Sequence, residues 1–304
     1  MRTRRKLLLA TESRAPGTVA VNGRAAGATV ALWPDPAGTA PARVAWFACA
    51  LRTDRGRVRD ANEDSIFALV TTVPRGPGVL PMPCGFFAIA DGMGGLAEGA
   101  AASSGVIRQV TGQVVSALLA PALGAPQVAA QATVPDLLSE ALAGANARLY
   151  RQARQSGRRS GTTFSGAIVL GRQITIAHIG DSRVYLYGPG GLRRLTQDHS
   201  VAGRLLELGR LDAAELHDNP QRNVLYRYLG LALHVEIQTA VLALDGATHL
   251  VLCTDGLWDV MGDVRLAEVL ATAPTVDAAA DCLVNEANAR GGPDNISVIV
   301  VRLS

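Results

Sequence analysis

The sequence predicts an α+β fold in which antiparallel sheets carry helices on their outer faces. Strand-like segments come in runs, helical segments come in pairs between those runs, and no segment is repeated along the chain. A fold built from βαβ units would instead alternate strand and helix. With 304 residues, 48% of them hydrophobic, the chain is long enough to bury a full core.

The elements are predicted from apolar periodicity and from the turn residues that separate them. The first half of the chain is predicted to contain strands over 44–51, 66–73 and 84–90, then helices over 98–120 and 136–156. The second half is predicted to contain strands over 162–171, 173–180 and 183–188, a mixed helical insertion over 199–230, strands over 234–244 and 249–256, two helices within 263–290, and a last strand over 295–303.

Residues 1–44 are rich in Ala, Gly, Pro and Arg without a sustained period, which predicts a disordered tail before one domain over 45–304. Residues 1–45 hold seven Lys and Arg against two acidic residues, whereas the remainder holds 22 basic and 24 acidic residues. The overall charge of +3 therefore belongs to the tail, and no nucleic-acid-binding domain is predicted. Two alternatives stay open for the tail. It could be an arm that contacts acidic partners or lipid headgroups, or it could result from translation from an upstream start codon.

Neither a secretory signal nor a membrane span is predicted. The apolar run near the start is too short for a signal core, and Pro, Gly and Gln interrupt the longest uncharged stretch, residues 109–135. The four cysteines form no CxxC pair and have small or apolar neighbours, which predicts buried free thiols. These features favour a reducing, cytoplasmic location.

Aspartates recur at the ends of the predicted strands, each beside small or turn-forming residues: Asp64, Asp91, Asp181, Asp255 and Asp294. One Asp-Gly pair alone would indicate only a turn. If the five apolar strands are neighbours in paired sheets, their five carboxylates are predicted to lie together at one edge of those sheets. Such carboxylates would raise one another's pKa unless a cation neutralised them.

Oxygen ligands without a His or Cys cluster favour Mg²⁺ or Mn²⁺ over Zn²⁺. A carboxylate that bridges two such ions can hold a hydroxide as nucleophile. Glycine after the carboxylate, as in Asp91-Gly92, would let a backbone carbonyl approach the metal.

Arg59 lies five residues before Asp64 in a polar connection, where its guanidinium could clamp a phosphate. A solvated loop arginine is the alternative, because other arginines are close by. His178 alternates with apolar residues and is predicted to be a satisfied core or rim residue. His199 starts the insertion, and both a structural and a functional role stay open for it.

At these residues the chain resembles the metal-dependent (PPM, type 2C) Ser/Thr protein phosphatases, especially the bacterial branch. The stretches that carry the resemblance occur in the family's order between about residues 46 and 303: "DRGRVRDANEDS", "ADGMGG", "SGTTFSGAIV", "AHIGDSRVYL", "LTQDHS", "LLELGRL", "NPQRNVL", "LVLCTDGLWD" and "GGPDNISVIVV". Each stretch alone is weak evidence, but the ordered set is specific. One departure is Met93, where eukaryotic relatives often have His, so no general acid is carried over.

The resemblance implies a four-layer αββα sandwich with metals at one end and a flap at residues 199–230. It implies that Asp91 bridges two Mn²⁺ or Mg²⁺ ions and that the Gly92 carbonyl is a ligand. The resemblance implies that Asp255 and Asp294 complete the ligand shell of the first metal and that Glu63 and Asp64 hold metal-bound waters. It also implies that Arg59 binds the substrate phosphate and that Asp181 forms a third metal site with Asp255.

The function implied is removal of phosphate from phosphoserine and phosphothreonine on proteins by a two-metal-activated hydroxide, without a phosphoenzyme. The expected partners are phosphorylated proteins, with a bacterial Ser/Thr kinase as the opposing enzyme and a monomeric state. A non-catalytic phosphoprotein-binding module on the same fold is the alternative from another class. A third reading keeps the phosphatase but gives it a phosphorylated regulator of an anti-sigma-factor or secretion pathway as its target.

Overall fold

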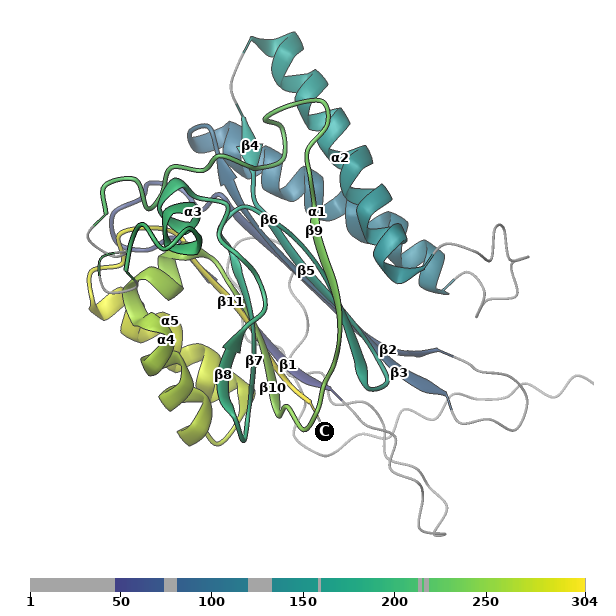
Figure 1. The fold of residues 1–304 in the computed structure, drawn as a ribbon, viewed down its shortest axis with the longest axis vertical. Helices are drawn as coiled ribbons and strands as arrows, with labels where there is room; N and C mark the ends of the chain where they lie inside the picture. Colours follow the sequence, from purple (N-terminus) through teal and green to yellow (C-terminus); the bar gives the residue numbers. More distant parts are fainter. Residues whose placement is uncertain are drawn as a thin grey trace, which may run out of the picture.

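The computed structural model describes residues 47–73, 81–119, 133–157, 160–212, 215 and 219–303. The predicted disordered tail, residues 1–44, lies outside these ranges. The described residues confirm the predicted α+β sandwich of two antiparallel sheets (Figure 1).

The first sheet has five strands in the order β1 (Ala48–Asp54), β11 (Ile296–Arg302), β10 (His249–Cys253), β7 (Arg183–Gly188) and β8 (Gly191–Arg194). The second has the order β2 (Asp64–Val73), β3 (Met82–Met93), β5 (Phe164–Leu170), β6 (Gln173–Ile179) and β9 (Gln238–Ala243), with β4 (Gly161–Thr162) paired to the end of β3. Every paired strand is antiparallel to its neighbour.

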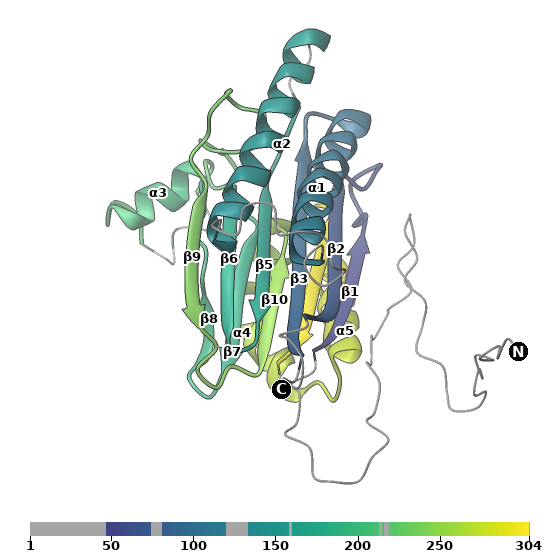
Figure 2. The ribbon, with the colours of Figure 1, turned by 90° about the vertical axis from the view of Figure 1, so that its right-hand side faces the viewer.

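Two helices cover the outer face of each sheet. α1 (Leu96–Leu119) and α2 (Val134–Ser156) pack on the second sheet, and Figure 2 shows them lying over its strands. α4 (Asp255–Thr272) and α5 (Val276–Ala289) pack on the first sheet. The layers therefore run helix, sheet, sheet, helix, as the family resemblance implied.

Side-chain alternation along β3 explains how one strand serves two cores and also the site. Phe86, Ala88 and Ala90 are buried against α1 and α2, whereas Phe87 and Ile89 are buried between the sheets. Because strand side chains alternate with a period of two, Asp91 continues the Phe87 and Ile89 side. The last carboxylate of the strand is thus directed to the end of the space between the two sheets.

β8 and α4 differ from the sequence prediction. β8 was not predicted, because its four residues GLRR carry no apolar run. The first helix of the final pair was expected after residue 262, but α4 already begins at Asp255. The prediction places Thr254, Asp255 and Gly256 at the end of the preceding strand. Thr254 has the extended backbone of an N-cap, and Asp255 in the first turn is stabilised by the helix dipole.

The predicted flap lies between β8 and β9 and contains one helix in its described part, α3 (Val201–Glu207). The Ser200 side chain caps this helix by accepting a hydrogen bond from the Gly203 N–H. Two isolated bridges, Ser200 with Leu225 and Thr162 with Leu229, fix the second half of the flap to its own start and to β4. The strand after the flap begins at Gln238, four residues later than predicted.

Candidate functional site

The antiparallel register of β2 and β3 places Asp64 directly opposite Asp91. Both aspartates come from the second sheet, at the end where β2 begins and β3 ends. Asp181 lies in the turn between β6 of the second sheet and β7 of the first sheet. Three of the predicted carboxylates are therefore assembled by strand pairing and one tight turn.

The first sheet supplies the other two aspartates. Asp255 follows β10 and opens α4, and Asp294 lies two residues before β11. Together with the second sheet's residues they surround a cavity of about 550 Å³. The cavity is lined by seven of the eight predicted site residues: Arg59, Glu63, Asp91, Gly92, Asp181, Asp255 and Asp294. Asp64 is not among its lining residues.

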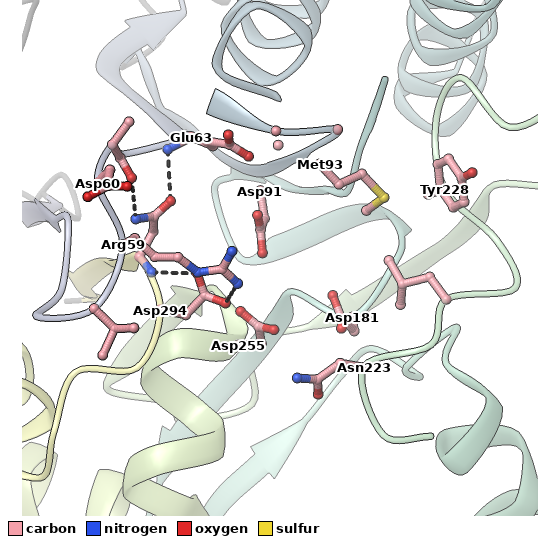
Figure 3. Close-up of a pocket in the computed structure, with 17 residues that line it drawn as sticks. Arg59, Asp60, Glu63, Asp91, Met93, Asp181, Asn223, Tyr228, Asp255 and Asp294 are labelled. Carbon is pink, nitrogen blue, oxygen red and sulfur yellow. Dashed lines mark hydrogen bonds and ion pairs between the residues drawn. The ribbon is translucent and has the colours of Figure 1, made fainter. Parts of the chain in front are cut away.

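Figure 3 shows Asp91 near the centre of this cavity, with Arg59 and Asp294 together on one side and Asp181 on the other. Asp255 lies between Asp294 and Asp181. The side chains come from distant parts of the chain, and their oxygens share one polar space.

The carboxylates strongly perturb one another. Burial raises the pKa of Asp91 well above its usual range, and the carboxylates of Asp64, Asp255, Asp181 and Asp294 raise it further. Burial also raises the pKa of Asp64 to about 7 and that of Asp255 to about 6. Such a cluster binds either protons or a cation more tightly than isolated carboxylates do.

Two buried oxygens in this cluster have no hydrogen-bond partner. Asp64 accepts a hydrogen bond from the Thr254 hydroxyl through Oδ2 at 2.9 Å, but its Oδ1 and the Oδ1 of Asp255 are unsatisfied. Orphaned buried oxygens are costly unless a ligand supplies positive charge. This all-oxygen donor set fits a hard divalent ion such as Mg²⁺ or Mn²⁺.

In the described part of the chain, no three His, Cys, Asp or Glu side chains form a closed metal cage as they stand. The positive charge that lies among the carboxylates is Arg59, whose Nη2 donates to Asp294 Oδ2 at 2.5 Å. The side chain of Arg59 is 56% exposed, so it can exchange this carboxylate for another anion. A cation bound at Asp294 would release Arg59 for that purpose.

Gly92 is enclosed by backbone on the side where a side chain would stand. A Cβ atom there would overlap the carbonyl oxygen of Gly99 and lie 2.7 Å from that of Glu63. The Gly92 N–H donates to the Glu63 carbonyl at 3.2 Å, which holds the start of β2 against the end of β3. Glycine is required here for close approach of three backbone segments.

The Glu63 carboxyl lines the cavity, and burial raises its pKa. Its backbone is fixed by Asn295, whose Oδ1 accepts from the Glu63 N–H at 2.8 Å while Nδ2 donates to the carbonyls of Arg55 and Ala61. Asn295 also lines the cavity and was not predicted. The only feature of the sequence that could have indicated a site role for Asn295 is its position next to Asp294.

Three flap residues also line the cavity and were missed: Asn223, Leu225 and Tyr228. The flap was predicted to lie beside the site, and these contacts bear that out. Figure 3 shows Tyr228 and Met93 on the side of the cavity away from Arg59. No strand-end pattern marks these residues, because their position depends on the tertiary bridges of the flap.

Predictions outside the site had mixed outcomes. His178 is fully buried and hydrogen bonded through both ring nitrogens, which confirms its core role. Cys49, Cys84 and Cys253 are buried free thiols, as predicted, but Cys282 is exposed. Among the described residues, none of the helices has the length and apolar character needed to cross a bilayer.

Several known proteins are similar to this chain. The family model described as protein phosphatase 2C matches residues 82–290. The serine/threonine phosphatase stp of Listeria monocytogenes is 32% identical over 255 residues, covering 82% of this chain and 93% of its own. The serine/threonine protein phosphatase PstP of Mycobacterium tuberculosis is 33% identical over 261 residues, covering 83% of this chain and 44% of its own.

A crystal structure of the catalytic domain of serine/threonine protein phosphatase PstP in complex with two manganese ions superposes with a TM-score of 0.67 at 28% identity. The superposition covers 85% of this chain and 99% of that one. The matched family model, these identities and the shared sandwich agree with the ordered motifs of the sequence: the chain belongs to the protein phosphatase 2C family.

Proposed function

We propose that this protein is a metal-dependent phosphatase that hydrolyses phosphoserine and phosphothreonine on proteins. The observation that carries the proposal is the convergence of carboxylates from both sheets on one cavity that also holds Arg59. Membership of the protein phosphatase 2C family supports it, as do relatives named serine/threonine phosphatases.

The residues of the cavity fit the roles expected from the family. Asp91 would bridge two Mn²⁺ or Mg²⁺ ions, with the carbonyl of Gly92 and the carboxylates of Asp255 and Asp294 as further ligands. Glu63 and Asp64 would hold water molecules of the metal shell, and Asp181 with Asp255 would form a third site. When bound, the ions supply positive charge against the phosphate and activate water for attack on phosphorus.

The cavity lining also supports direct attack by water. No Ser, Cys or His is found among its described lining residues. Phosphoserine-, phosphocysteine- and phosphohistidine-enzyme intermediates therefore have no lining side chain to form on. An aspartyl phosphate would need one of the carboxylates that we propose as metal ligands. We propose hydrolysis without a phosphoenzyme, and the absence of a lining histidine fits the missing general acid at Met93.

A direct test is phosphate release from a phosphothreonine peptide by protein loaded with Mn²⁺, beside the same protein in excess chelator. We expect turnover that needs the metal and that Mg²⁺ supports to a lesser or similar degree. Binding of the phosphopeptide without any phosphate release would identify a non-catalytic binding module instead. No turnover after metal loading at several pH values would refute the proposed function.

Arg59→Ala is expected to raise KM for the phosphopeptide by about tenfold or more with a smaller effect on kcat. A charge-assisted hydrogen bond to phosphate contributes about 1.5–3 kcal/mol. Steady-state kinetics with and without the substitution measure this. Arg57→Ala is the matched control, since Arg57 is exposed two residues earlier and does not line the cavity. Equal KM values for the two variants would remove the phosphate-binding role from Arg59.

The remaining partners follow from the same proposal. We place the enzyme in the cytoplasm, opposite a bacterial Ser/Thr kinase, and consistent with this three of its cysteines are buried free thiols. We propose a monomer that binds phosphorylated proteins and no nucleic acid.

A further inference from the structure

His199, the first residue of the flap, makes a reciprocal pair of hydrogen bonds with Gly180. The His199 backbone N–H donates to the Gly180 carbonyl at 2.7 Å, and the Gly180 N–H donates to His199 Nδ1 at 3.0 Å. His199 is only 4% exposed and does not line the cavity. Gly180 immediately precedes Asp181, so this pair lies one residue from a carboxylate of the site.

The second hydrogen bond determines the state of the imidazole. A backbone N–H can only donate, so Nδ1 of His199 must be the acceptor and carries no proton. Burial, together with the nearby ring of His178, lowers the pKa of His199 to about 3. The neutral ring with its proton on Nε2 is therefore the form present at neutral pH.

The peptide planes around Asp181 are fixed from two directions. The Gly180–Asp181 peptide is held by the His199 N–H, and the Asp181–Ser182 peptide is held by Trp258, whose Nε1 donates to the Asp181 carbonyl at 3.0 Å. The His199 ring holds the preceding plane through the Gly180 N–H. Peptide units are planar, so these ties fix the direction in which the Asp181 side chain leaves the backbone.

These ties matter because the local chain does not fix itself. Gly180 has φ +109°, in a region that L side chains rarely adopt and in which glycine imposes little preference. A free turn of this kind would let Asp181 sample several directions. The external hydrogen bonds of His199 and Trp258 help to select one of them. The hydrogen bonds of Thr163 and Ser165 to Ser182 hold the other end of the turn.

The same histidine also holds the flap. Its carbonyl accepts a hydrogen bond from the Tyr226 N–H at 3.0 Å, and its ring packs against that of Tyr226 with centroids 5.9 Å apart. Leu225, which precedes Tyr226, lines the cavity. One residue thus contacts both the backbone that carries Asp181 and the flap segment that contributes Leu225 to the cavity wall.

We infer that His199 is a positioning residue: through an unprotonated Nδ1 it fixes the Gly180–Asp181 turn, and through its backbone and ring it sets the flap wall relative to that carboxylate. The inference rests on the proposed function for its consequence in catalysis. Its structural part, the tie to Gly180, is independent of any activity.

Leu and Asn are the matched substitutions. They have nearly the same shape and both remove the ring from His178 and Tyr226, but only Asn keeps an acceptor close to the position of Nδ1. We expect His199→Leu to lower kcat/KM for a phosphothreonine peptide about fivefold or more, mainly through kcat, because Asp181 loses one of its ties. We expect His199→Asn to stay within about twofold of wild type.

Hydrogen exchange of the Gly180 amide, followed by NMR, gives a readout that needs no turnover. The amide should exchange at least about tenfold faster in His199→Leu than in His199→Asn, at similar unfolding temperatures of the two variants. Equal exchange rates would overturn the inference. Equal kcat/KM values for the two variants, with wild type active, would overturn the link from His199 to Asp181.

If wild type shows no turnover, the proposed function fails, and the exchange rates alone decide the positioning role. Trp258→Phe gives a second measurement should His199→Leu not fold. Phe retains a ring beneath the Arg183 guanidinium, which lies 3.4 Å from the ring centroid in wild type, but removes the donor to the Asp181 carbonyl. We expect a similar fall in kcat/KM, and an unchanged value would contradict the positioning of Asp181 by its backbone ties.

Discussion

Asp91→Asn is expected to lower metal-dependent turnover by about three orders of magnitude. Asp91 lies at the centre of the carboxylate cluster and is the proposed bridge between two ions, so its loss removes several kcal/mol of charge stabilisation from the transition state. Phosphate release from a phosphothreonine peptide at saturating Mn²⁺ measures the effect. Turnover within tenfold of wild type would contradict the role.

The same substitution is expected to stabilise the metal-free protein. Burial and four neighbouring carboxylates raise the folded-state pKa of Asp91 above the value of about 3.9 in an unfolded chain. The folded state therefore holds this proton more tightly than the unfolded state does. Stability is unaffected by the group below about pH 4 and falls as the pH rises through the folded-state pKa.

Asn cannot ionise and escapes this loss. A gain of about 1 kcal/mol, the scale of one pKa unit, corresponds to about 2–4 °C in unfolding temperature for a domain of this size. Thermal unfolding in excess chelator should show the variant above wild type at pH 7.5 and close to it at pH 4. A variant less stable than wild type at pH 7.5 would show that the cluster does not cost the metal-free fold stability.

Gly92→Ala is expected to abolish the site and to destabilise the domain by several kcal/mol. The added Cβ would overlap the Gly99 carbonyl and crowd that of Glu63, and backbone atoms on both sides cannot move aside as a flexible side chain would. Chemical denaturation of the metal-free protein measures the loss, and activity assays should show no turnover.

Gly105→Ala on α1 is the control for that experiment. No heavy atom lies within 4 Å of the Cβ position at Gly105 outside the helix's own backbone, and its backbone is helical. The substitution should leave activity unchanged and stabilise the helix by up to about 1 kcal/mol. Equal stability changes at the two positions would mean that Gly92 is not confined as the backbone geometry indicates.

Much of the carboxylate cluster could be predicted because strand ends are visible in the sequence. An apolar run followed by Asp-Gly identifies where β3 delivers Asp91, and the same pattern marks Asp255 after β10. The alternation of Phe87 and Ile89 then gives the side to which Asp91 belongs. The register of Asp64 opposite Asp91 was not predictable, since it depends on pairing across an intervening connection.

The flap contribution depends on tertiary contacts and was therefore beyond sequence reasoning. Leu225 lines the cavity because its backbone pairs with Ser200, and Tyr228 does so close to the bridge between Leu229 and Thr162. Neither contact leaves a periodic pattern. The start of α4 was missed for a different reason: Thr-Asp-Gly is compatible with a turn and with a helix N-terminus, and only packing of the helix on the sheet selects the second.

His199 illustrates the same division. The sequence located it at the start of the flap, but its hydrogen bonds reach back to Gly180, nineteen residues earlier. A residue that acts by holding another residue's backbone belongs to no sequence motif that would identify its role. Its role became visible only when the turn after β6 and the start of the flap were seen together.

The central claim is that carboxylates from both sheets form one site for divalent cations. Calorimetric titration of chelator-treated protein with Mn²⁺ tests it most directly, with Asp91→Asn as the altered protein and Glu140→Gln, an exposed residue of α2, as the control. We expect wild type and Glu140→Gln to bind at least two ions per chain and Asp91→Asn to lose this binding. Undiminished Mn²⁺ binding by Asp91→Asn, or no binding by wild type, would contradict the claim.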